Sequence, residues 1–192
     1  MFDVIIDIGH FDYESGAVSQ GYREADLNKQ ISDKIIKILQ KDYKLKVGVT
    51  TGSLPDRTKF ENKNPAKMFV SVHCNAGGGT GFESWIYKTG YNAEKIASSI
   101  NSELTNLGVK NRGIKVNPSF YVLKNTNAPA VLIECGFIDS SDIKYLTTRQ
   151  DDIAKYISNG IVKYLGTDKK PSSRKVITVE KGIDTIEIKL QQ

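Results

Sequence analysis

Apolar residues along this chain follow two alternating patterns. Short apolar runs predict buried strands, and longer stretches in which apolar residues recur every three or four positions predict helices. Between Asn92 and Leu107, for example, Ile96 and Ile100 fall on one side of a helix, and Gly108 is placed to end it. The predicted strands are residues 2–8, 45–50, 68–72, 82–87, 119–123 and 130–133, and the predicted helices are residues 23–41, 55–63, 92–107 and 151–165.

This alternation predicts an α/β fold. We expect a three-layer αβα sandwich, with a mainly parallel or mixed sheet of about six strands and helices on both faces. In such folds functional groups gather at the carboxyl ends of the strands. Three places meet that condition, namely Gly9-His10, residues 73–75 and residues 134–136.

The composition changes after Gly166. Residues 167–175 are polar and contain a proline and two serines, which is typical of a linker. Residues 176–192 alternate apolar and polar positions about Lys181-Gly182, which predicts a β-hairpin. We therefore expect one domain over residues 1–166, and a hairpin tail that packs on it, packs on a second chain, or opens a further domain.

Composition and charge exclude several classes of protein. The 192 residues are 39% hydrophobic and 26% charged, which is ordinary for a globular protein. The net charge of +5 is compatible with an anionic partner, but no basic block is interleaved with aromatic residues, which disfavours nucleic acid. The two cysteines, Cys74 and Cys135, are too few for a secreted disulfide scaffold.

The first residues of the chain predict a strand rather than a targeting segment. The stretch MFDVIIDIGH lacks a basic region and places acids among its apolar residues, unlike a signal peptide. No apolar run approaches the roughly 20 residues that span a bilayer. We expect synthesis in the cytoplasm without a leader and without membrane insertion.

Both histidines of the chain follow predicted strands, and an acid accompanies them. His10 and His73 come directly after apolar runs, and Glu24 continues the buried stripe of the first helix. A carboxylate on a buried stripe has to be paired or bind a cation. Two imidazoles and one carboxylate form a three-ligand catalytic zinc set that leaves a fourth position for water.

Glu134 and the two cysteines refine this hypothesis. Glu134 ends the apolar run 130–133, and beside a metal it is suited to act as general base and then as acid. Cys74 and Cys135 each directly follow a proposed site residue. Period-2 alternation points both thiols to the other face of the sheet, so an open catalytic site is favoured over a closed structural one.

Seven stretches of the chain resemble the zinc-dependent N-acetylmuramoyl-L-alanine amidases of the type-3 class. They are IDIGH with SGA (6–10 and 15–17), READLN (23–28), DRTKFEN (56–62), FVSVHCNA (69–76), NRGIK (111–115) and FYVLKNTNAPAVLIECGFIDSSDI (120–143). Members of this family are peptidoglycan hydrolases, found as bacterial autolysins and phage endolysins. The chain departs from the family pattern beside the first histidine, where Ile8 precedes Gly9-His10 and residues 11–13 replace glycines.

The resemblance implies a site and a substrate. It implies one zinc ion per chain on His10, Glu24 and His73, with Glu134 as the catalytic glutamate. The implied substrate is the amide between the lactyl group of N-acetylmuramic acid and the L-alanine of the stem peptide, so the enzyme would lyse the cell wall after release from the cell. Family members often carry a wall-targeting module after such a linker, so we favour a truncated wall-binding domain for the tail.

Some alternatives stay open at this point. Asn75 and Arg112 are candidates to grip the glycan or the peptide carboxylates, although Arg112 also fits a surface arginine in a turn beside a glycine. The chain could instead be a zinc peptidase that cleaves within the stem peptide, or a non-catalytic wall-binding module. Retention of Glu134 and of all three ligands argues against the last.

Overall fold

The computed structural model describes residues 1–11 and 13–169, together with the backbone of residues 177–181 and 186–190. Its centre is a six-stranded sheet in the order β4-β1-β5-β8-β6-β7. Strands β4, β1, β5 and β8 run parallel, whereas β6 is antiparallel to β8 and parallel to β7. The strands span Val4–Ile8 (β1), Val47–Thr50 (β4), Phe69–Asn75 (β5), Phe82–Ile86 (β6), Asn111–Val116 (β7) and Ala130–Phe137 (β8).

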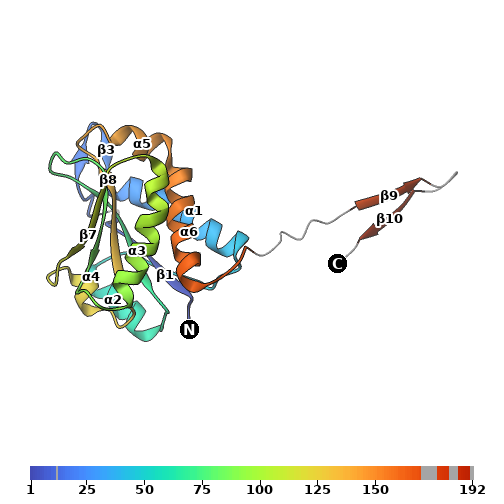
Figure 1. Ribbon diagram of the computed structural model, residues 1–192, viewed down its shortest axis with the longest axis horizontal. Helices are drawn as coiled ribbons and strands as arrows, with labels where there is room; N and C mark the ends of the chain where they lie inside the picture. Colours follow the sequence, from blue (N-terminus) through green and yellow to red (C-terminus); the bar gives the residue numbers. More distant parts are fainter. Residues whose placement is uncertain (12, 170–176, 182–185, 191–192) are drawn as a thin grey trace.

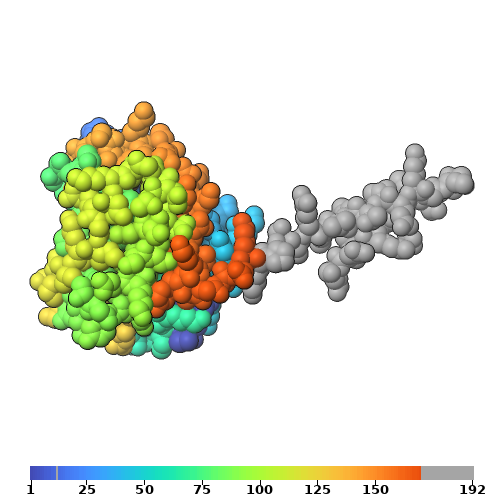
Figure 2. Space-filling model, in the orientation of Figure 1, coloured from blue at the N-terminus to red at the C-terminus, as the bar shows by residue number. Residues whose placement is uncertain are grey.

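Three long helices cover one face of the sheet. They are α1 (Glu24–Asp42), α3 (Asn92–Leu104) and α6 (Gln150–Leu165), which lie side by side in Figure 1. Each buries a stripe of residues three and four apart against the sheet, as the periodicity predicts. Gly108 and Gly166 adopt the left-handed conformation that ends the predicted helices. Figure 2 shows residues of α3, in yellow-green, and of α6, in orange, on the surface of this layer.

Two shorter helices cover the other face. They are α2 (Leu54–Lys63) and α4 (Tyr121–Asn125). A second and smaller apolar cluster lies beneath them, with Phe69 and Leu132 from the sheet and Leu123 from α4. Helices therefore lie on both faces of a mixed sheet, and the predicted three-layer α/β fold class is confirmed.

The structure corrects one predicted element and adds two that were not predicted. Residues 119–123 were expected to form a strand, but the helix α4 begins at Tyr121 and buries Val122 and Leu123 in the smaller apolar cluster. The strand β7 escapes prediction because its residues are half-buried or exposed and show no apolar alternation. The helix α5 (Ile143–Thr148) was also not expected.

Two predicted strands are longer than expected, and the extensions carry site residues. The strand expected to end at Val72 continues to Asn75, and the strand expected to end at Ile133 continues to Phe137. His73 and Glu134 therefore lie on strands β5 and β8 rather than in the loops that follow them. Their positions are fixed by the sheet.

The remaining elements are short. A two-stranded ribbon pairs β2 (Val18–Ser19) with β3 (Tyr22–Arg23), and a 3-10 turn, η1 (Thr105–Leu107), follows α3. In the tail, β9 (Ile177–Lys181) and β10 (Ile186–Leu190) pair antiparallel, as the predicted hairpin requires. Residues 170–175 of the predicted linker lie outside the described residues, as do 182–185 of the hairpin. Among the described helices, none has the length and the apolar character to cross a membrane.

Candidate metal centre

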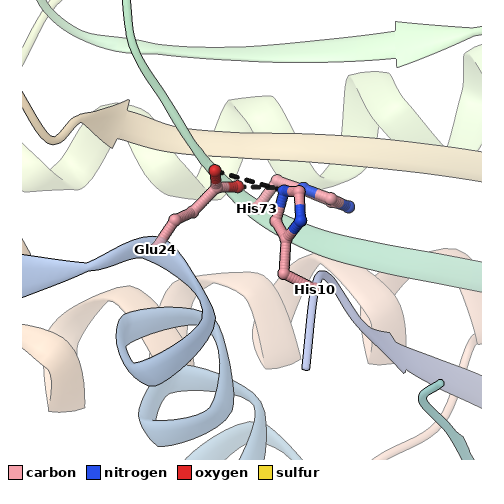
Figure 3. Close-up of side chains that lie close together, drawn as sticks. All are labelled: His10, Glu24 and His73. Atoms are coloured by element: carbon pink, nitrogen blue, oxygen red, sulfur yellow. Dashed lines mark hydrogen bonds and ion pairs between the residues drawn. The ribbon is translucent and has the colours of Figure 1, made fainter. Parts of the chain in front are cut away.

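Three predicted ligands converge at the carboxyl end of the parallel strands. His10 follows β1, Glu24 is the first residue of α1, and His73 lies on β5, and their side chains point toward one another (Figure 3). Nδ1 of His73 lies 3.0 Å from Oε1 of Glu24, and Nε2 of His10 lies 3.2 Å from Oε2. One ligand atom from each residue falls within 4.8 Å of the other two. The carboxylate thus stands between the two imidazoles.

Backbone and amide donors fix the carboxylate of Glu24. Its Oε2 accepts a hydrogen bond from the backbone N–H of Ala17 (3.0 Å), and its Oε1 accepts one from that of Cys74 (3.2 Å). Asn28, one helical turn later, donates to Oε1 and also to the carbonyl of Gly9, just before His10. These contacts hold the stretches READLN and SGA against the end of IDIGH.

Two glycines leave the room that the ligands need. A Cβ on Gly9 would lie 2.5 Å from the ring of His73. A Cβ on Gly16 would lie 2.6 Å from both Oε2 of Glu24 and the ring of His10, and Gly16 has a positive φ of 64°. Any side chain at these two positions would displace a ligand.

The pKa values of Glu24 and His73 are shifted from their usual ranges. Burial alone would raise the pKa of Glu24, but the hydrogen bonds to His10 and His73 outweigh it and hold this pKa well below its usual range. Burial would lower the pKa of His73, yet hydrogen bonding to Glu24 and the charge of Glu134 raise it. Glu24 is therefore ionised at neutral pH, as a carboxylate ligand of a cation must be.

Glu134 stands beside this group. It is the register partner of His73 in the pairing of β5 with β8. Its Oε2 is buried and has no hydrogen-bond partner among the described residues. Burial raises the pKa of Glu134 to about 7; the charges of Glu24 and Glu83 raise it too, against an opposing effect of His73 and His10. A carboxyl group with a spare oxygen and a pKa near neutrality is suited to take up a proton and return it.

A buried ion pair lies against the strands that precede His10 and carry His73. Asp7, on β1, is fully buried, and its Oδ2 lies 3.3 Å from Nη1 of Arg57 on α2. Ser71 and Thr50, on the strands to either side, donate hydrogen bonds to the same carboxylate. The carboxylate of Asp7, paired with Arg57, thus links the strands β4, β1 and β5, and its contact on β5 is Ser71, two residues before His73.

Asn75 and Arg112, predicted to contact substrate, both bind a carboxylate of the protein. Asn75 donates to Oε1 of Glu83 at 3.1 Å, and Nε of Arg112 donates to Oε2 at 2.6 Å. Trp85 and Lys115 donate to Glu83 as well. We call Asn75, Glu83, Trp85, Arg112 and Lys115 the Glu83 cluster. Glu83 is the register partner of Glu134 in the pairing of β6 with β8, so the cluster adjoins the site on the side away from the metal ligands.

The cysteines lie where the sheet alternation predicts. Cys74 and Cys135 are free and buried in the large apolar cluster beneath α1, α3 and α6. Neither thiol belongs to the group of converging side chains, which consists of His10, Glu24 and His73. Burial raises the pKa of both thiols, which keeps them protonated at neutral pH.

Comparisons with known proteins agree with this geometry. A family described as N-acetylmuramoyl-L-alanine amidase matches residues 4–163. The chain belongs to the N-acetylmuramoyl-L-alanine amidase family. The predicted family and enzyme class are therefore confirmed, and the activity of this amidase is directed at peptidoglycan.

The relatives of this amidase come from phage and from bacteria. It is 36% identical over 183 residues to an endolysin of Bacillus phage SPP1, which covers 87% of this chain and 67% of the endolysin. It is also 36% identical to a sporulation-specific N-acetylmuramoyl-L-alanine amidase of Bacillus subtilis, over 90% of this chain and 72% of that protein. The crystal structure of an N-acetylmuramoyl-L-alanine amidase from Clostridium difficile 630 superposes with a TM-score of 0.81 at 34% identity, over 86% and 97% of the two chains.

Sequence reasoning missed the partners of the site residues. Glu83 carried a detectable signal, because a charged residue inside the apolar strand FESWI has to find partners when that strand is buried. Glu14, which lies 3.4 Å from Nδ1 of His10, carried none, since it stands in a polar turn. The contacts of Glu83 depend on how separate strands pair, and the contact of Glu14 with His10 depends on the conformation of an irregular turn.

Proposed function

We propose that His10, Glu24 and His73 hold one zinc ion, and that Glu134 moves the proton while this amidase hydrolyses the bond between N-acetylmuramic acid and L-alanine. The observation that carries the proposal is the convergence of three ligand side chains beside a carboxyl group whose pKa is raised to about 7. The proposed partner is peptidoglycan, and the proposed place of action is the cell wall.

The residues fit a zinc ion in number, chemistry and spacing. Two imidazoles and one carboxylate are a common catalytic donor set. With one ligand atom taken from each residue, the three atoms lie within 4.8 Å of one another, which is close enough for one ion with bonds of about 2.0–2.2 Å to draw them together. The hydrogen bonds that Ala17 and Cys74 donate to Glu24 orient this ligand.

The bound zinc would polarise the scissile carbonyl and activate a water molecule. Glu134 then accepts the proton of the attacking water on its free carboxylate oxygen. The same residue returns that proton to the nitrogen of L-alanine, because an amine leaves far more readily than an amide anion. In the metal-free protein the pKa of Glu134 is raised, so its carboxyl group holds a proton more readily than an ordinary glutamate does, which suits a group that carries the proton between the two transfers.

Two substitutions test this division of roles. Glu134→Gln should keep one zinc per chain while turnover falls by about a hundredfold to ten-thousandfold, and His73→Ala should lose zinc and activity together. Metal analysis and the hydrolysis of purified muropeptides measure both. Glu103→Gln, which alters a carboxylate on α3 that pairs with Lys163, is the control and should change neither.

Mass spectrometry of the products tests the bond that is cut. Release of intact stem peptides from muramic acid supports the proposal, whereas fragments of the stem would identify a peptidase. If Glu134→Gln lost its zinc, Glu134 would be a ligand and the assignment would be wrong.

A further inference from the structure

The Glu83 cluster carries more positive charge than its own carboxylate neutralises. Glu83 is almost fully buried, and its Oε2 accepts hydrogen bonds from both Arg112 (2.6 Å) and Lys115 (2.5 Å). Its Oε1 accepts from the neutral groups of Asn75 and Trp85. Two cations therefore share one carboxylate, and a net charge of +1 remains.

Both cations keep donors that reach solvent. Arg112 binds Glu83 through Nε, and no described residue accepts a hydrogen bond from its two terminal nitrogens. Its guanidinium carbon lies 4.9 Å from the ring centroid of Phe137, and its side chain is 27% exposed. Lys115 is 32% exposed and stands 5.0 Å from the ring centroid of Trp85. The cluster thus presents an anchored pair of cations, a suitable receptor for a carboxylate.

The pair lies at a defined place relative to the reacting groups. His73, Glu134 and Glu83 form one row across β5, β8 and β6 as successive register partners. Strands lie about 4.8 Å apart, so the backbone of Glu83 is about 10 Å from that of His73. The metal ligands stand on one side of Glu134 and the two cations stand on the other.

The stem peptide offers an anion close to the scissile amide. Its second residue, when joined to L-alanine and extended through its side-chain carboxyl group as γ-linked D-glutamate, keeps a free α-carboxylate. That group lies about two residues from the scissile amide, or roughly 7 Å along an extended chain. We propose that Arg112 and Lys115, held by Glu83, bind the free α-carboxylate of the second stem-peptide residue. This inference rests on the proposed function.

The single tryptophan provides a direct probe of this binding. Trp85 is the one tryptophan of the chain, its indole donates to Glu83, and Lys115 lies over its ring. A carboxylate that draws on Lys115 should therefore change the fluorescence of Trp85. L-alanyl-γ-D-glutamate should give a saturable change, and the same dipeptide with its α-carboxylate converted to a carboxamide should bind about tenfold more weakly.

Charge removal tests the assignment residue by residue. Lys115→Met and Arg112→Gln should each reduce the preference for the acidic dipeptide, while Lys124→Met, at an exposed lysine of α4, should leave it unchanged. Three results would overturn the proposal. The unaltered protein could bind both dipeptides with equal affinity, or show no saturable fluorescence change with either. The variants could also lose affinity equally for both dipeptides. The comparison within each variant separates a lost contact from a misfolded protein.

Hydrolysis gives the second measurement. Muropeptides with the free carboxylate should show a KM about tenfold lower than amidated ones at a similar kcat, and Lys115→Met should reduce that difference. Equal KM values for both substrates would contradict the subsite while leaving the amidase proposal intact. If neither muropeptide were hydrolysed, the proposed function would fail, and the fluorescence titration would still decide whether the cluster binds a carboxylate.

Discussion

The carboxylate of Glu14 lies 3.4 Å from Nδ1 of His10, on a ring whose Nε2 faces Glu24. Apart from this ion-pair contact, Nδ1 is buried without a hydrogen-bond partner among the described residues. The backbones of Phe11 and Glu14 exchange two hydrogen bonds, of 3.1 and 2.8 Å, which hold the carboxylate beside the ring. Glu14 is thus placed to keep the proton of His10 on Nδ1 and to leave Nε2 free for a metal.

Removing this carboxylate should weaken the metal site. We expect Glu14→Ala to bind zinc about tenfold more weakly, at the lower end of the usual effect because Glu14 is largely exposed. Glu14→Gln keeps an acceptor oxygen and should recover part of the loss. Competition with a chromogenic chelator measures both affinities, and an unchanged affinity in Glu14→Ala would show that His10 needs no such partner.

Gly16 should be required for metal binding and not only for its turn. Gly16→Ala places a Cβ 2.6 Å from Glu24 and from His10, whereas Gly21→Ala meets nothing within 4 Å. Both glycines have positive φ, so both substitutions should cost about 1–2 kcal/mol of stability through backbone strain. Zinc content should fall in Gly16→Ala alone. Equal zinc loss in the two variants would mean that the backbone conformation, and not the close approach, matters.

The raised pKa of Glu134 predicts how the stability of the metal-free protein depends on pH. A carboxyl group with a pKa of about 7 in the folded state and about 4.3 in the unfolded state favours folding while protonated. This contribution is present below pH 4 and is lost as pH rises through 7. Glu134→Gln stays neutral, so its stability relative to the unaltered protein should increase by roughly 3 kcal/mol between pH 4 and pH 8.

Urea unfolding of chelator-treated protein at the two pH values measures that difference. The substitution should change little at pH 4 and be stabilising at pH 8. A stability difference that does not vary with pH would show that Glu134 has an ordinary pKa in the folded protein. The measurement does not depend on catalysis, so it tests the environment of Glu134 separately from its role.

The sequence predicted the parts of the site that local patterns encode. The helices α1, α3 and α6 follow from periodic apolar stripes, and His10, Glu24 and His73 stand out because polar groups at strand ends or on a buried stripe need a reason. The strand β7 and the helix α4 could not be predicted, because one lies half-exposed at the sheet edge and the other is a single short turn. The Glu83 cluster depends on β6 lying antiparallel beside β8, a pairing that no local pattern states.

The chain that ends at Gly166 should fold and function without its tail. The two apolar clusters of the described residues contain no residue beyond Leu165, and Gly166 ends α6 in a left-handed conformation. Of the described residues that follow, Lys169 forms a largely exposed ion pair with Asp42, worth at most about 1 kcal/mol. Zinc content, the midpoint of thermal unfolding and turnover on soluble muropeptides should therefore stay close to those of the full chain.

We propose, as the sequence led us to expect, that residues 167–192 belong to a wall-binding element rather than to the catalytic domain. Truncation at Gly166 should then lower the amount of protein retained on insoluble cell walls while leaving hydrolysis of soluble muropeptides unchanged. Truncation after Tyr156 is the matched control, because it removes the buried Ile157 and Ile161 of α6 and should unfold the domain. If truncation at Gly166 also unfolded it, or turned a dimer into a monomer, the tail would be a packing or oligomerisation element.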